Sequence, residues 1–431
     1  MNPRSARALT IAVAVILLEC SGAFAQASLQ VPVQFDFLNP GARSLALGSA
    51  FAGLADDATA AFTNPAGLTL LSRPEVSIEG RARRLESSFL RAGRLSGRVT
   101  NQGVDVASGP VYGTFDDTHV GPSFLSLTYP RGRFAIAAYR HELLNVDQAF
   151  RTSSIFQADA FGDVVQGARD ASRQIAIVTY GISAAHRAGS HVSFGGGLIV
   201  QKMSFSSDFR TFDPPSPYAA PDFAKLSSRT IQSSDDTGVG GTFGVLVTLS
   251  PRLQLGGVYR KAPSFDFTTQ PVGGTSTTGT FHVPDTLAVG AAVRVAIPLL
   301  VTVEYTRVHY SALKVDFIDS QVGRSTGRDN FTIDDGNEVH AGLEYVFTNV
   351  ARTPAVRVGA WYDPRHTVRY TPSAQRTLND ELFSAYLPRG RNLVHATAGA
   401  GVAISSRLEM NAAFDYSSRT RTGSASVVVR F

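Results

Sequence analysis

The chain has 431 residues, of which 43% are hydrophobic and 17% charged, and its formal net charge is +5. The basic residues do not cluster in one segment, which argues against a nucleic-acid-binding surface. The single cysteine, Cys20, lies near the N-terminus. The remainder of the chain therefore has no disulfide and no thiolate metal site.

Residues 1–25 have the pattern of a secretory signal peptide. Two arginines precede an apolar core from Leu9 to Leu18, and Ala23-Phe24-Ala25 fits the small-x-small cleavage pattern. A membrane anchor helix needs about 20 apolar residues, and this core is shorter. No later segment has 18 consecutive apolar residues, so we expect no helical span. Cleavage would place the mature N-terminus near Gln26.

Residues 26–73 do not alternate as a strand would. Within them, residues 41–71 are rich in small residues and favour helix, and Pro65 biases Asn64 away from helical dihedral angles. The strands predicted for the rest of the chain would enclose a lumen too wide for wall side chains to fill. We therefore predict that 26–73 fold into this lumen as a hatch. A flexible leader is the alternative interpretation.

Apolar and polar residues alternate from about residue 74 to the C-terminus. Val339, Ala341 and Leu343 share one phase, for example, whereas Glu338 and His340 share the other. Successive side chains of a strand point to opposite faces, so each such segment is apolar on one face and polar on the other. The predicted strands lie near 74–90, 122–130, 132–147, 172–187, 190–207, 236–250, 252–268, 283–296, 299–316, 338–349, 354–370, 391–405, 407–418 and 423–431.

The connections between these fourteen strands alternate between short and long. Long ones fall at 91–121, 148–171, 208–235, 269–282, 317–337 and 371–390, with 419–422 as a short exception. This alternation is typical of a transmembrane barrel with tight periplasmic turns and long outer loops, and not of a soluble β-sandwich. An even strand number places both termini on the periplasmic side.

The predicted fold class is all-β: a transmembrane antiparallel β-barrel of about 14 strands with a small N-terminal helical hatch inside the lumen. The predicted domains are a signal peptide (1–25), the hatch (26–73) and the barrel (74–431). The predicted location is the outer membrane of a Gram-negative bacterium. Val427, Val429 and Phe431 alternate at the C-terminus, and a terminal Phe431 suits recognition by the barrel assembly machinery; an ordinary edge strand ending in Phe is the alternative.

The hatch region resembles a known family. Ala55-Asp56-Asp57-Ala58, followed by Asn64-Pro65-Ala66 directly before the first predicted strand, is similar to the hatch motif of the FadL/TodX family of outer-membrane transporters of long-chain fatty acids and hydrophobic compounds. The resemblance extends over essentially the whole mature chain, although the hatch motif is its most specific part. Weaker matches follow at Tyr259-Arg260, Pro284-Asp285, Glu304-Tyr305 and Leu387-Pro388.

The resemblance implies passive uptake of long-chain fatty acids or apolar hydrocarbons by a hatch-bearing monomer without a cofactor. It implies that the ligand enters from an outer groove, passes the hatch and leaves sideways through a kinked strand. His309-Tyr310 stand where the family often has a tryptophan, and Trp361 is the only one here. Distant relatives with the hatch motif serve protein secretion, so a secretion-associated or structural barrel is the alternative. A general porin is a third reading, against which residues 26–73 argue.

The chain lacks the short motifs of serine hydrolases, nucleotide-binding loops, zinc proteases and dinucleotide-binding enzymes, so we expect no enzyme, no metal and no cofactor. Arg260, Arg294 and Arg357 fall on the polar phase of their strands, and we predict that they face the lumen. An arginine there can hold a fatty-acid carboxylate by a bidentate hydrogen bond, or can pair with other wall or hatch residues. Asp56 and Asp57 can cap backbone amides or pair with wall arginines.

Overall fold

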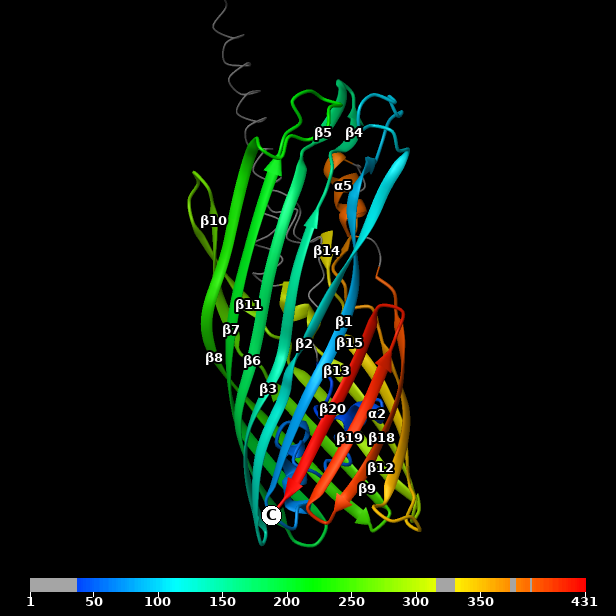
Figure 1. Ribbon diagram of the computed structural model, residues 1–431. Coiled ribbons are helices and arrows are strands. Elements are labelled where there is room, and N and C mark those ends of the chain that lie inside the picture. Colours follow the sequence, from blue (N-terminus) through cyan, green and yellow to red (C-terminus); the bar gives the residue numbers. More distant parts are fainter. Residues whose placement is uncertain (1–36, 315–329, 373–376, 388–389) are drawn as a thin grey trace, which may run out of the picture.

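The structure is a computed structural model and describes residues 37–314, 330–372, 377–387 and 390–431. The predicted signal peptide and residues 26–36 lie outside these ranges. Fourteen antiparallel strands form a closed barrel, since β1 pairs with both β2 and the last strand, β20 (Figure 1). The wall strands are β1 (Glu75–Arg94), β2 (Gly109–Arg131), β3 (Phe134–Arg151), β6 (Ala168–Ala188), β7 (Val192–Phe212), β8 (Leu226–Ser250), β9 (Leu253–Lys261), β12 (Thr286–Ala296), β13 (Leu299–Val308), β15 (Gly336–Val346), β16 (Pro354–Asp363), β18 (Leu393–Ser405), β19 (Leu408–Tyr416) and β20 (Thr420–Arg430).

Smaller elements occupy the connections and the N-terminal segment. The additional strands are β4 (Ile155–Asp159), β5 (Gly162–Gln166), β10 (Ser264–Pro271), β11 (Thr277–His282), β14 (Phe331–Thr332) and β17 (Arg369–Tyr370). The helices are α2 (Ala42–Ala46), α3 (Ala60–Thr63), η2 (Pro65–Leu70), η3 (Tyr310–Leu313) and α5 (Leu378–Tyr386). Within the described ranges, none of these helices is long and apolar enough to cross a membrane.

The predicted number of wall strands is confirmed, but several predicted boundaries are wrong. β2 begins at Gly109 and β8 at Leu226, so the connections predicted at 91–121 and 208–235 are much shorter. The strand predicted at 252–268 ends at Lys261, and Pro263 precedes the separate β10–β11 hairpin. Proline fixes φ and lacks a donor, which favours such a break. The wall is consequently unequal in height, tall along β1 to β8 and short along β9 to β20 (Figure 1).

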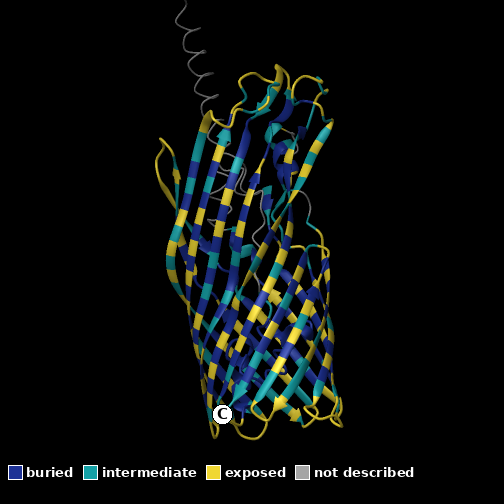
Figure 2. Cartoon of the chain, in the orientation of Figure 1, coloured by how far each residue is buried: buried dark blue, intermediate teal, exposed yellow. Residues whose placement is uncertain are grey.

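Burial alternates along the wall strands, as the banding in Figure 2 shows. On β15 the apolar residues Val339 and Leu343 are 53% and 44% exposed, whereas Glu338 and His340 are buried. The apolar phase therefore faces outward and the polar phase faces the lumen. A soluble β-sandwich would bury its apolar phase, so this arrangement is that of a transmembrane barrel.

The hatch lies inside the lumen at the end of the barrel that carries the short turns (Figure 1). Helix α2 contacts β18 and β19, and η2 contacts β6, β7 and β8 on the opposite side of the wall. Nearly all residues of α2, α3 and η2 are buried, from Ala42 in α2 to Thr69 in η2. For residues 37–73, the predicted position of the hatch inside the lumen is confirmed.

Candidate functional site

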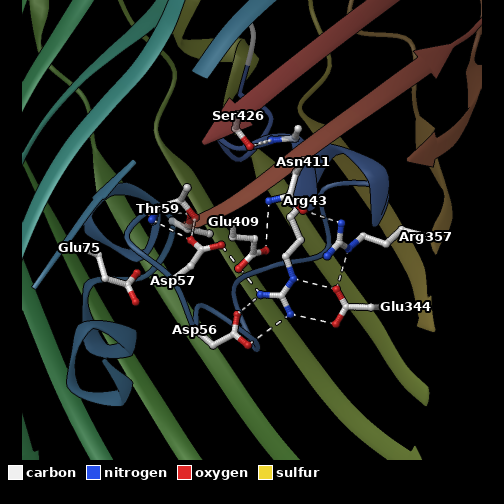
Figure 3. Close-up of polar contacts among 12 residues, drawn as sticks. Arg43, Asp56, Asp57, Thr59, Glu75, Glu344, Arg357, Glu409, Asn411 and Ser426 are labelled. Carbon is white, nitrogen blue, oxygen red and sulfur yellow. Dashed lines mark hydrogen bonds and ion pairs between the residues drawn. The ribbon is translucent and has the colours of Figure 1, made fainter. Parts of the chain in front are cut away.

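Arg43 of α2 connects the hatch to the wall. Its Nη1 atom lies 2.6 Å from Oδ1 of Asp56, and its Nε atom donates to Oε2 of Glu344 on β15 at 2.8 Å (Figure 3). Glu344 also accepts a hydrogen bond of 2.6 Å from Nε of Arg357 on β16. These charges are largely buried, and breaking a buried pair by removing one partner is strongly destabilising. The network therefore holds the hatch in one position.

Asp57 has a different role from its neighbour Asp56. Its Oδ1 atom accepts hydrogen bonds from the backbone N–H and the hydroxyl group of Thr59, at 2.8 and 2.5 Å. This local turn lies at the start of α3, where aspartate commonly satisfies free amides. Of the two roles expected from the sequence, Asp56 thus pairs with an arginine, and Asp57 accepts from a backbone amide and also lies 4.0 Å from Nη1 of Arg43. This arginine belongs to the hatch, not to the wall.

Asn64, Pro65 and Ala66 join the hatch to β8 and β7. The side-chain amide of Asn64 donates to the carbonyl oxygen of Ala52 at 2.9 Å and to that of Val245 on β8 at 3.1 Å. Its Oδ1 atom accepts from the backbone N–H of Ala66 at 3.2 Å, and Pro65 opens η2. Asn64 is completely buried. The Asn64-Pro65-Ala66 motif therefore contacts the wall, and its asparagine also caps η2.

Inward-facing glycines of the wall allow the hatch backbone to approach unusually closely. A Cβ atom on Gly244 would lie 2.1 Å from Oδ1 of Asn64, and one on Gly256 would lie 2.0 Å from the carbonyl oxygen of Ala52. We call the glycines with such contacts the glycine belt. They are Gly195, Gly244, Gly256, Gly342, Gly359 and Gly399, the last of which would meet the Cβ atom of Ala46 and not the hatch backbone. They come from six strands around the wall, so the hatch is fitted to the wall on both sides of the lumen.

The three arginines predicted to face the lumen have different surroundings. Arg260 donates to the carbonyl oxygen of Phe62 at 2.7 Å, and its guanidinium lies 3.9 Å from the centroid of that ring. Arg357 donates to Glu344 and Asn411. Arg294 is exposed at the end of β12, so the prediction that it lies within the lumen is wrong. It lies on the inward phase, but the strand has reached the mouth of the barrel there.

A large apolar cluster lies inside the barrel beyond the hatch. Its residues come from β3, β6, β7, the β10–β11 hairpin, η3, β14 and α5, which places aromatic rings in the lumen of the tall half. We call this set the lumenal cluster. It consists of Leu143, Leu144, Val146, Ile175, Ile177, Met203, Phe205, Ala262, Phe265, Phe267, Phe281, Val283, Val308, Tyr310, Leu313, Phe331, Ile333 and Phe383. An apolar interior of this kind suits hydrophobic molecules.

Arg169 lies on the inward face of β6, on the side of the lumenal cluster that is away from the hatch. It is 2% exposed, and its Nε and Nη1 atoms have no hydrogen-bond partner in the described part of the chain. Its guanidinium lies 5.0 Å from the ring centroid of Tyr386 on α5, whose hydroxyl group is also buried and has no hydrogen-bond partner among the described residues. A buried charge normally has a partner, because leaving it unpaired costs several kcal/mol. Sequence reasoning missed Arg169, because the strand predicted at 172–187 begins after it, whereas β6 begins at Ala168.

The wall opens between β2 and β3. These strands pair only from Phe124 and His141 to the turn, while the rest of β2 pairs with β1 alone. Pro122 lacks a backbone donor, and β3 has an irregularity after Glu142, so the ladder ends at this level. We call the opening the β2–β3 gap. A small pocket there is lined by Arg81, Arg83, His119, Ser123, Glu142, Leu143, Leu144 and Asn145.

The β2–β3 gap is polar on one side and apolar on the other. Nε2 of His119 lies 2.9 Å from Oε1 of Glu142, and Nη2 of Arg83 donates to the carbonyl oxygen of Asn145 at 2.8 Å. Leu143 and Leu144 line the gap and also belong to the lumenal cluster. The gap therefore borders directly on the apolar interior.

Comparison with known proteins gives matches of structure only. No protein-family model matches the chain, and no curated protein matches its sequence. A solved FadL homologue from Pseudomonas aeruginosa superposes with a TM-score of 0.61 and 15% identity, covering 93% of this chain and 99% of that one. This chain has the fold of the FadL proteins.

Two toluene transporters share the FadL fold with this chain. TodX of Pseudomonas putida and TbuX of Ralstonia pickettii superpose with TM-scores of 0.57 and 0.56 and identities of 14% and 16%. Each comparison covers 92% of this chain and 99% of the transporter. At such identities the likeness establishes the fold, which agrees with the resemblance seen at the hatch motif.

Proposed function

We propose that this protein is a passive channel through which hydrophobic molecules cross the outer membrane. The observation that carries the proposal is the lumenal cluster together with the β2–β3 gap that borders on it. An apolar ligand is stabilised among aromatic and aliphatic side chains by about 25 cal/mol per Å² of apolar surface removed from water. The route runs from the long connections into the cluster and out through the gap.

The hatch favours this sideways route over a straight one. The glycine belt and the pairs of Arg43 pack the hatch against the wall, so passage through it would require many buried contacts to break. At the gap the β2–β3 ladder is already absent, so passage there would break side-chain contacts such as those of His119 with Glu142 and of Arg83 with Asn145, but no backbone ladder. The solved relatives named above include transporters of toluene, which supports a hydrophobic ligand.

We further propose that the ligand carries a carboxylate, as a long-chain fatty acid does, and that Arg169 binds it. Arg260 and Arg357 are occupied by wall and hatch partners and Arg294 is exposed, so Arg169 replaces them in this role. The six residue steps from Arg169 to Ile175 span about 20 Å of strand, the length scale of such a ligand. The carboxylate would satisfy Arg169 while its tail lies against the lumenal cluster.

The proposed topology places the short turns and both termini in the periplasm. The long connections would then form the outer face, where ligand arrives. The protein would act as a monomer, without an energy source or cofactor, and Phe431 would be recognised by the barrel assembly machinery. These assignments rest on the alternation of short and long connections and on the alternating C-terminal strand.

Cross-linking the β2–β3 gap tests the proposed route. The chain has no cysteine after Cys20, so a pair introduced as His119→Cys and Asn145→Cys can be joined by a short, reducible bis-thiol reagent. In a strain without its own transporter, we expect the cross-link to reduce fatty-acid uptake at least tenfold and reduction to restore it. The matched control is Tyr180→Cys with Val200→Cys, two outward residues that face each other across the intact β6–β7 ladder.

The outcomes separate the candidate functions. Undiminished uptake with the gap cross-linked would contradict the sideways route. Absence of uptake for every fatty acid and hydrocarbon tested, with folded protein present in the outer membrane, would favour the secretion-associated or structural barrel. Free passage of small polar solutes would indicate a general porin.

A further inference from the structure

The turns at the C-terminal end of the barrel carry an unusual set of charges. Six short turns join the strands there, and each has an arginine in the turn or within three residues of it. Arg73 adds one more charge just before β1. We call these residues the arginine rim: Arg73, Arg131, Arg133, Arg187, Arg252, Arg294, Arg352 and Arg407. All are exposed except Arg187, which is half-buried.

No acidic residue balances the arginine rim. The turns at 132–133, 189–191, 251–252, 297–298, 347–353 and 406–407 contain neither aspartate nor glutamate. Two carboxylates on the adjoining strand ends, Glu75 and Glu409, both pair with Arg430, each at 2.9 Å. Within the described ranges, six of the eight rim side chains make no hydrogen bond or ion pair; Arg187 and Arg294 donate to backbone carbonyl oxygens.

Toward the opposite end of the barrel, several arginines form ion pairs with aspartates. Arg94 lies 2.6 Å from Asp105 and 2.8 Å from Asp163, and Arg84 lies 2.6 Å from Asp116. Some arginines toward this end thus have acidic partners, whereas the short turns contain cations and no carboxylate.

The arginine rim lies next to the apolar outer face of the wall. Tyr129 and Phe134, which flank Arg131 and Arg133, are 52% and 62% exposed. Exposed apolar side chains likewise lie near other rim residues: Leu249, Ile297, Val350 and Ile404. The outward apolar residues face lipid tails, so exposed guanidinium groups in the turns just beyond them lie at the headgroup level of the same leaflet. Arg187, which donates to the hatch carbonyl oxygen of Thr69, and Arg294, on the inward phase of β12, are the exceptions.

We propose that the arginine rim binds the phosphate groups of anionic phospholipids in the leaflet that surrounds the short turns. Guanidinium groups bind phosphate in a bidentate manner, and a positive surface attracts an anionic leaflet. The rim residues follow every turn around the barrel, which fits a leaflet enclosing the whole circumference. A protein partner, in contrast, would contact the turns on one side of the barrel. The proposed topology makes this the inner, periplasmic leaflet, so that assignment rests on the proposed function.

Reconstitution of the full chain tests the lipid contact. The temperature at which the compact, unheated form is lost on gels is measured in vesicles of phosphatidylcholine, with and without phosphatidylglycerol. We expect phosphatidylglycerol to raise this temperature for the native protein and high salt to remove the rise. The triple variant Arg131→Gln, Arg252→Gln and Arg407→Gln should lose about half of the rise. The control variant Arg98→Gln, Arg365→Gln and Arg391→Gln, at the opposite end, should keep it.

Three further arms identify the source of the anion and separate this proposal from the topology. An equal rise in phosphatidylcholine vesicles with free inorganic phosphate would overturn the lipid assignment. A rise with lipopolysaccharide that depends on the rim, without one from phosphatidylglycerol, would move the rim to the outer leaflet. Labelling of Ser250→Cys on intact cells by an impermeant reagent would overturn the topology while leaving the phosphate contact standing. Equal responses of the two triple variants would overturn the rim proposal itself.

Discussion

Buried arginines inside this barrel are of two kinds. Arg43 and Arg357 both donate to Glu344, and its carboxylate offsets their buried positive charge. Arg169 has no such neighbour among the described residues, although it is equally buried. An arginine of the first kind stabilises the hatch. An arginine of the second kind raises the free energy of the unliganded protein, and a bound anion would offset this cost.

Substitution of Arg169 separates a ligand-binding role from a structural one. Arg169→Gln removes an unpaired buried charge, so we expect thermal stability to stay equal or to rise. Uptake of a long-chain fatty acid should fall about tenfold, as expected for loss of a charge-assisted hydrogen bond worth about 1.5–3 kcal/mol. Uptake of a neutral hydrocarbon should not change. A parallel loss of both uptakes, or a marked loss of stability, would indicate that Arg169 is structural.

Asp163 provides a pH-dependent contact among the long connections, outside the wall strands. Hydrogen bonds from Arg94 and from the hydroxyl group of Tyr218 lower the pKa of Asp163 to about 2. A lowered pKa means that this contact stabilises the structure above the unfolded pKa of about 3.9 and is lost as the pH falls through about 2. The segments that contain Arg94, Asp163 and Tyr218 should therefore separate between about pH 4 and pH 2.

A spin label at Val106, introduced as Val106→Cys, reports this separation. Val106 is exposed and lies beside Asp105, which also pairs with Arg94. We expect its mobility to increase as the pH falls below about 4, and Asp163→Asn to increase it already at neutral pH. A label at Val272, in the distant β10–β11 turn, is the control. Equal pH profiles at the two positions would contradict the role of Asp163.

At the scale of elements, the fit between the hatch and the wall depends on the absence of side chains. Gly244→Ala places a Cβ atom 2.1 Å from Oδ1 of Asn64, and overpacking of this kind costs about 1–3 kcal/mol. We expect hydrogen exchange of the hatch amides to accelerate accordingly. Gly423→Ala on β20 is the matched control, because its new Cβ atom would have no other atom within 4 Å. Equal protection of the hatch amides from exchange in both variants would contradict the role of the glycine belt.

Asn64→Ala addresses the same contact from the hatch. It leaves the carbonyl oxygens of Ala52 and Val245 without the amide that now donates to them. Each lost partner costs about 1–3 kcal/mol, so the hatch should loosen while the barrel stays folded. We expect hydrophobic uptake to change, whereas migration of the unheated protein on gels should not.

At the scale of the whole molecule, closure of the barrel depends on its last residues. β20 pairs with β1 from Arg430 opposite Glu75, and the backbone N–H of Phe431 donates to the carbonyl oxygen of Pro74 at 3.0 Å. An open edge in lipid leaves backbone groups unsatisfied at several kcal/mol each. We expect Phe431→Asp to reduce folded protein in the outer membrane several-fold, and Phe431→Tyr to leave it unchanged. Normal levels of the Asp variant would contradict the assembly role of Phe431.

The alternation along the chain is sufficient to predict fourteen wall strands, the outward apolar face and a separate hatch. Each of these features follows from a local pattern, since a strand alternates with period two and 41–71 does not. The same reasoning places Glu338 and His340 on the inward face correctly. It places the start of β2 wrongly, because residues 109–121 extend beyond the apolar part of the wall and carry polar residues on both faces.

Only the tertiary structure decided the partners of these residues. Asn64 contacts Val245 across 181 residues of chain, and Arg43 contacts Glu344 across 301, distances over which no local pattern carries information. The β2–β3 gap is likewise invisible in the sequence, because Pro122 and the irregularity at Glu142 weaken the ladder only when the two strands are set side by side. Period and composition are properties of single segments, and they determined the barrel. The hatch contacts, the gap and the unpaired Arg169 are properties of segments brought together by closure of the sheet.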